Sequence, residues 1–231
     1  MPTPDLSSAG FWTRRGPITA LVILVLAVTV AIPGVGALGA FAIAIVAVLI
    51  ARKQGSVADI GLKRPASWPR ILVATLAFGF AFQLLSLIVI EPLLARLTGA
   101  PVDISAFDGV RGNFQAFLML LAIGWIVGGF LEELTFRGFV VSRICWLLGS
   151  SPASAWVGVT IAAVVFGLAH AYQGISGMIV TGLTGFILGA IYVAFRFNLW
   201  YAMLSHGFMN TAGILAIYLD IDRRLGALLL G

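Results

Sequence analysis

The chain has 231 residues, of which 61% are hydrophobic and only 10% are charged, and its formal net charge is +5. Soluble domains carry about 25% charged residues, and the mean hydropathy here is +1.08, so the composition excludes an ordinary water-soluble globule. The basic residues stand singly or in pairs between apolar runs, which is typical of topology-setting membrane loops and argues against a nucleic-acid-binding surface.

The apolar runs, taken in chain order, predict helices that cross a membrane. The predicted spans are 18–32, 36–51, 71–95, 114–148, 153–170, 175–195 and 199–219. The fourth run is too long for one ordinary span of about 20 residues, so it is either one long helix or a span followed by an amphipathic piece. The predicted fold class is all-α, a multi-pass transmembrane helix bundle with about seven or eight spans.

The same pattern divides the chain into four regions. We expect an N-terminal tail at 1–16, transmembrane helices and loops at 17–113, a core that carries the polar motifs at 114–219, and a C-terminal tail at 220–231. The first two spans together are much longer than the apolar stretch of a secretory signal, so they predict a retained hairpin. The distribution of basic residues between the loops predicts a cytoplasmic N-terminus.

The fourth apolar run contains three charged residues that need a reason to be buried. Glu133 and Arg137 are four residues apart, so they lie on one face of a helix and can form an ion pair. Glu132 points about 100° away from Glu133 and has no such local partner, which suits a general base or acid. Gly124 and Gly128 share the face of Glu132, and they either admit another helix or leave a cavity above the carboxylate.

Two later runs carry the only two histidines of the chain. Phe166 precedes His170 by one helical turn, and His206 precedes Asn210 by one turn. A neutral imidazole at His170 could share a water molecule with Glu132, while His206 and Asn210 could both donate hydrogen bonds toward a developing oxyanion. These groups together form a coherent set for hydrolysing an amide.

Each of these features also has a structural interpretation. A single glutamate or histidine in a membrane helix is often an interhelical hydrogen-bonding group, and a Glu–Arg pair four residues apart is usually structural. The joint occurrence of three polar clusters in three apolar runs favours a catalytic site. Cys145 has no second cysteine to pair with and is interpreted as a small packing residue.

At these residues the chain resembles the CPBP family, which includes the type II CAAX prenyl endopeptidases and bacteriocin-processing or immunity proteins. The ordered motifs of that family are Glu-Glu-x-x-x-Arg, Phe-x-x-x-His and His-x-x-x-Asn/Asp. All three occur here within residues 114–215, as Glu132-Glu133…Arg137, Phe166…His170 and His206…Asn210.

The resemblance implies an intramembrane endopeptidase of the glutamate type in the cell membrane. The residues implied to be catalytic are Glu132, His170, His206 and Asn210. The residues implied to support the site are Glu133, Arg137 and Phe166. The implied partners are membrane lipid and a peptide or membrane-protein substrate, lipidated or not, and no cofactor is required.

Three alternatives stay open from the sequence. One is a zinc site, with Glu132, His170 and His206 as ligands, since one carboxylate and two imidazoles are a sensible zinc set. The second is a non-proteolytic membrane scaffold or a bacteriocin self-immunity protein of the same family. The third is a proton-coupled transporter, which the lack of an evident internal repeat disfavours.

Overall fold

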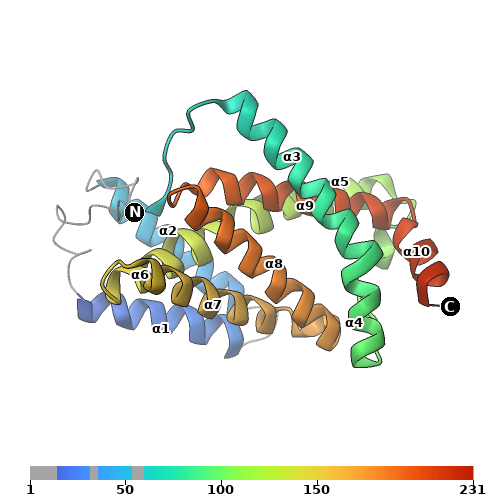
Figure 1. Ribbon diagram of the computed structural model, residues 1–231, viewed down its shortest axis with the longest axis horizontal. Coiled ribbons are helices and arrows are strands. Elements are labelled where there is room, and N and C mark those ends of the chain that lie inside the picture. The colour runs from blue at the N-terminus through green and yellow to red at the C-terminus, as the bar shows by residue number, and fades with distance from the viewer. Residues whose placement is uncertain (1–14, 32–35, 54–59, 231) are drawn as a thin grey trace.

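The structure is a computed structural model that describes residues 15–31, 36–53 and 60–230, and every regular element in these ranges is a helix (Figure 1). In chain order the helices are α1 Arg15–Ala31, α2 Gly36–Lys53, α3 Trp68–Leu85, η2 Ser86–Ile90, α4 Glu91–Thr98, η3 Ser105–Val110, α5 Phe114–Ile123, η4 Gly124–Glu132, η5 Leu134–Val141, α6 Ser142–Leu147, α7 Pro152–Ala169, η6 Ala171–Gln173, α8 Gly174–Ala194, α9 Leu199–Tyr218 and α10 Ile221–Leu230. The prediction of an all-α fold is confirmed for this part of the chain.

Several consecutive helices join into longer rods that are apolar enough to cross a membrane. Four meet both criteria of length and composition within the described residues: Trp68–Thr98, Phe114–Leu147, Pro152–Ala169 and Ala171–Ala194. A fifth is obtained if α9 and α10, which meet at a bend of 79°, count as one broken span. The expected number of seven or eight spans is therefore not confirmed.

The differences from the predicted elements have local causes. The run predicted at 114–148 is one continuous helix of 34 residues, Phe114–Leu147, which agrees with the alternative of one long helix. Its central part, η4 and η5, has π-helical winding, a rare form that often occurs at functional sites. The predicted C-terminal tail contains the helix α10, and the stretch between the predicted spans 71–95 and 114–148 contains the short 3₁₀ helix η3.

The helices that carry the polar motifs begin at side-chain caps. The Asn113 side chain accepts a hydrogen bond from the Ala116 amide at the start of α5, and Ser151 and Ser154 form a reciprocal capping box at the start of α7. The Asn198 side chain accepts from the Trp200 amide at the start of α9. These caps satisfy amide groups that a helix end leaves without an intrahelical partner.

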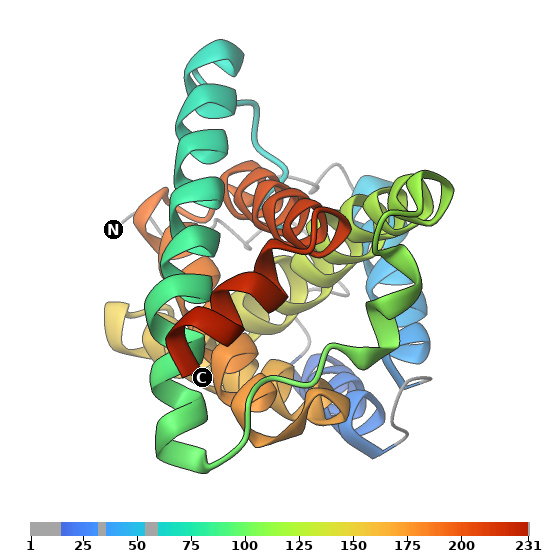
Figure 2. The same cartoon turned by 90° about the vertical axis from the view of Figure 1, so that its right-hand side faces the viewer.

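Helix α9 runs along the long axis of the molecule and packs against α3 and η4 (Figure 1). Its Gly207 lies against Gly129 of η4, where a Cβ added at position 129 would lie 3.3 Å from the Gly207 Cα atom. Helices α7 and α8 pack side by side next to it. At one end of the molecule α10 folds back against α4 and η2 (Figure 2). This arrangement brings the fourth apolar run, α7 and α9 together around one interior space.

Candidate active site

One cavity of about 390 Å³ lies between these helices, and all four residues expected to be catalytic line it. Glu132 comes from the long helix Phe114–Leu147, His170 from the end of α7, and His206 and Asn210 from α9. Phe166 also lines this space. We call it the main cavity. The structure thus brings together three polar clusters that are separated by at least 29 positions in the sequence.

Glycine makes the close approach of α9 to Glu132's helix possible. A Cβ added at Gly128 would collide with the Asn210 side-chain amide and lie 3.5 Å from His206 Nε2. A Cβ at Gly124 would lie 2.9 Å from the Ile214 Cδ1 atom. The two glycines admit the neighbouring helix α9 and also line the main cavity. Both roles that were predicted from their spacing are therefore present.

Glu133 is the central acceptor of a fully buried polar cluster. Its Oε1 atom accepts a hydrogen bond from Arg137 Nη1 at 2.6 Å, and neither side chain is more than 1% exposed. Arg137 Nη2 donates to the Gly185 carbonyl at 2.6 Å, which ties the cluster to α8. The predicted ion pair between Glu133 and Arg137 is confirmed.

His206 lies between the two adjacent glutamates, a placement that the sequence did not predict. Its Nδ1 atom is 2.8 Å from Glu133 Oε1, and its Nε2 atom is 3.8 Å from Glu132 Oε2. A carboxylate paired with Arg137 only accepts hydrogen bonds, so Nδ1 must be the donor. Nε2 therefore carries a lone pair when the imidazole is neutral and becomes a donor when the imidazole is doubly protonated.

His170 is held at the C-terminal end of α7 by its own helix. Its Nδ1 atom is 2.8 Å from the Phe166 carbonyl oxygen, and the two rings are 4.6 Å apart. Because a carbonyl oxygen only accepts, Nδ1 is the donor, and a neutral imidazole presents Nε2 as an acceptor. The Phe166 ring also contacts the His206 ring and lies 5.3 Å from the Arg137 guanidinium carbon. Phe166 thus packs against three groups of the site.

Asn210 uses part of its hydrogen-bonding capacity within the protein. Its Nδ2 atom donates to the Gly124 carbonyl at 2.8 Å. An amide nitrogen has two hydrogens, so one is left for a ligand. This bond orients the side chain beside His206, on the same face of α9.

The wall of the main cavity also contains polar residues that the sequence analysis did not select. Gln83, Ser86 and Glu91 come from the helix Trp68–Thr98, and Asp222 comes from α10. Ser86 Oγ donates to Glu91 Oε1 at 2.9 Å. The only sequence signal for this wall was an acidic residue near the end of a predicted span.

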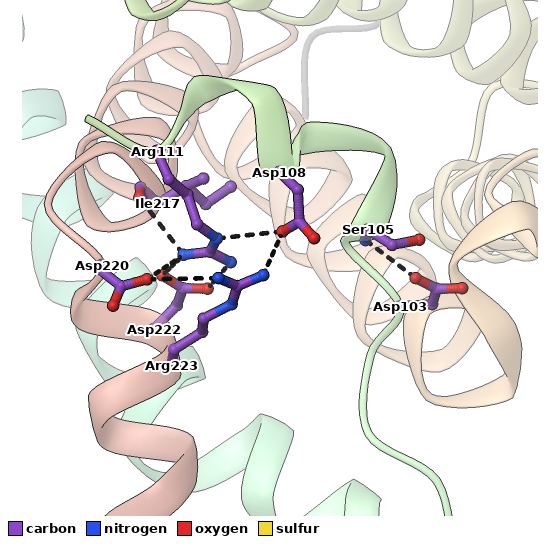
Figure 3. A network of polar contacts seen from close by, with 8 residues as sticks. All are labelled: Asp103, Ser105, Asp108, Arg111, Ile217, Asp220, Asp222 and Arg223. Carbon is purple, nitrogen blue, oxygen red and sulfur yellow. Dashed lines mark hydrogen bonds and ion pairs between the residues drawn. The ribbon is translucent and has the colours of Figure 1, made fainter. Parts of the chain in front are cut away.

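Asp222 also belongs to an ion-pair cluster with residues of the η3 segment and α10 (Figure 3). Arg111 donates to both carboxylate oxygens of Asp222, at 2.7 and 2.6 Å, and also pairs with Asp108 and Asp220. Arg223 pairs with Asp108 at 2.9 Å. Hydrogen bonding to Asp222 raises the pKa of Arg111 above its ordinary value. The cluster joins the η3 segment to α10.

The zinc alternative finds no support in the arrangement of donors. Across residues 15–31, 36–53 and 60–230, no group of three or more His, Cys, Asp or Glu side chains is placed to hold a metal ion. Glu132, His170 and His206 line the same cavity but do not form such a set.

Comparison with known proteins agrees with the motifs on which this site was selected. Residues 114–212, less than half of the chain, match the protein family described as Type II CAAX prenyl endopeptidase Rce1-like. No curated protein and no solved structure matches the chain. The matched family is a protease family, which supports a hydrolase, and the long apolar helices support an integral membrane protein. This match supports membership of the chain in the CPBP family.

Proposed function

We propose that this protein is an intramembrane endopeptidase that hydrolyses a peptide bond with a water molecule activated by Glu132 and His170. The observation that carries the proposal is that these two residues share one cavity with His206 and Asn210, although the four come from three different helices. The proposed location is the cell membrane. The proposed substrate is a peptide or membrane protein, lipidated or not.

In the proposed reaction Glu132 is the general base. It takes one proton from the water while the neutral His170 accepts a hydrogen bond from the same water at Nε2, the nitrogen that its bond to Phe166 leaves free. The hydroxide oxygen adds to the carbonyl carbon. The tetrahedral intermediate then collapses, the C–N bond breaks, and the proton on Glu132 passes to the leaving amine.

His206 and Asn210 are the proposed donors to the oxyanion. Asn210 donates with the amide hydrogen that Gly124 does not use. His206 donates from Nε2 only when it is doubly protonated, because Nδ1 already donates to Glu133. In that state the charges of Glu132, Glu133, Arg137 and His206 sum to zero, which lowers the cost of placing the cluster in a medium of low dielectric constant.

Glu133 and Arg137 are proposed to position His206 rather than to touch the substrate. Both are buried, and Glu133 holds the imidazole through Nδ1. A second partner fixing the orientation of a catalytic imidazole is a common feature of hydrolytic sites.

The test is a peptide-cleavage screen with purified protein in detergent micelles or liposomes. Glu132→Gln and His170→Ala should fold with an unchanged melting temperature and lose about 10²-fold or more in cleavage rate, the usual contribution of a general acid or base. Asp103→Asn is the matched control, since Asp103 is an acid of the loop that does not line the main cavity. Cleavage at the wild-type rate by either variant would contradict the proposal.

The same samples separate the alternatives. A scaffold or immunity protein yields no peptide product from wild type, and its motif variants lose folding or partner binding. A transporter shows solute or proton flux in liposomes that depends on Glu132. Metal analysis of the purified protein, with and without a chelator in the cleavage assay, tests the metal-free mechanism.

A further inference from the structure

The main cavity contains one carboxylate that the proposed mechanism does not use. Glu91 lines the same cavity as the catalytic set, and its Oε1 atom accepts a hydrogen bond from Ser86 Oγ at 2.9 Å. Ser86 is buried, with 3% exposure. Within the described part of the chain, Glu91 forms no ion pair.

The other carboxylates that line the main cavity do have partners. Glu132 is 3.8 Å from His206 Nε2, and Asp222 is held at both oxygens by Arg111. No Lys or Arg among the described residues lines the cavity. A carboxylate in such a place is costly unless it is paired. The cavity wall therefore has an acidic group to which a cation can bind.

Glu91 also lies where the main cavity meets a second pocket. This outer pocket, of about 310 Å³, shares Leu87, Glu91, Val102, Ile104 and Asp222 with the main cavity. Its two basic residues, Arg111 and Arg223, are both engaged by aspartates (Figure 3). Glu91 thus lines both pockets, whereas Glu132 lines only the main cavity.

We propose that Glu91 binds a Lys or Arg side chain of the substrate and so selects peptides with a basic residue near the bond that is cut. The inference rests on the proposed endopeptidase function. The substrate class is an apolar segment with a basic flank, and apolar residues of the cavity such as Leu120, Val127 and Ile214 cover the apolar part. Membrane-spanning segments commonly have Lys or Arg at their ends, so they belong to this class.

The first experiment measures selectivity in cleavage. An apolar, internally quenched peptide from the screen is made with Lys, norleucine or Glu at each position around the cleaved bond. Wild type should cut the best Lys peptide about ten-fold or more faster than its norleucine counterpart, the range expected for a hydrogen bond to a charged group. Glu91→Gln, which can keep the bond from Ser86, should bring this ratio near one. Glu91→Lys should favour the Glu peptide, and Asp103→Asn should leave the ratio unchanged.

The second experiment measures binding and does not depend on turnover. A fluorescent Leu/Ala peptide with one Lys or one norleucine is titrated into Glu132→Gln protein, with and without Glu91→Gln, in neutral detergent. Tighter binding of the Lys peptide only when Glu91 is present supports the inference. Equal affinities for the Lys and norleucine peptides in both proteins overturn the inference. It is also overturned if Glu132-dependent cleavage shows the same Lys preference in wild type and in Glu91→Gln. Loss of all cleavage with a retained binding preference counts against the endopeptidase function alone.

Discussion

Replacing Glu133 by Gln removes the negative charge that holds both Arg137 and His206. The guanidinium of Arg137, 1% exposed, then remains in the interior without its ion-pair partner. Removing one partner of a buried ion pair costs about 3–5 kcal/mol, because the remaining charge is not solvated. We therefore expect Glu133→Gln to lower the unfolding free energy by roughly that amount. Cleavage should fall by about 10²-fold, because the amide oxygen of Gln is a weaker acceptor for His206 Nδ1 than the carboxylate and holds the imidazole less firmly.

A double-mutant cycle separates these two effects. Arg137→Met leaves the contact between Glu133 and His206 Nδ1 in place, so it should cost stability but keep more activity than Glu133→Gln. The double variant has no unpaired charge, so its loss of stability should be smaller than the sum of the single losses by about 0.5–3 kcal/mol. It should still be inactive. Thermal unfolding by tryptophan fluorescence and the cleavage rate are measured on the same samples, and wild-type turnover by a stable double variant would refute the positioning role of Glu133.

Two further variants test the packing of the site and the ion-pair cluster outside it. Gly128→Ala places a Cβ against the Asn210 side-chain amide of α9, so we expect at least a ten-fold loss of cleavage from a misplaced oxyanion donor. The control Gly109→Ala, where a Cβ meets open space, should have no effect. Equal cleavage rates of the two variants would show that the close approach of α9 is not needed. Arg111→Gln removes the bonds between the η3 segment and α10 and should cost about 1–3 kcal/mol, while Arg223→Gln, at a side chain 56% exposed, should cost less. Because hydrogen bonding to Asp222 raises the pKa of Arg111, the stabilising charge is fully present below the ordinary arginine value of about 12.5 and is lost only above it. The difference in melting temperature between Arg111→Gln and wild type should therefore be the same at about pH 7 and about pH 9.5, and a difference that shrinks at the higher pH would contradict this assignment.

Much of the helical architecture could be predicted from the sequence. The predicted spans 71–95, 153–170 and 175–195 lie close to the helices Trp68–Thr98, Pro152–Ala169 and Ala171–Ala194, because long apolar runs without charge are strong local signals. The number of spans was harder to predict. It depends on whether neighbouring helices join, as they do in Phe114–Leu147, or bend, as α9 and α10 do by 79°.

In the candidate site, too, contacts within one helix could be predicted from the sequence and contacts between helices could not. The pairing of Glu133 with Arg137 was readable from their spacing, since residues four apart lie on one face of any helix. The contact of Glu133 with His206, 73 residues away, had no such local signal. Neither did the place of Glu91 in the cavity wall, because the catalytic residues that line the same cavity come from other helices.

The sequence by itself determined that this is an apolar helical chain with three polar clusters, and which residues within each cluster share a helix face. Those properties follow from composition and from the 3.6-residue period of the helix, both of which are local. Only the tertiary structure decided that His206 lies between the two glutamates, that Gly124 and Gly128 admit α9, and that Glu91 faces the same cavity. These relations depend on how helices pack against one another, which is set by the shapes of their surfaces and is not written in the spacing of any one segment.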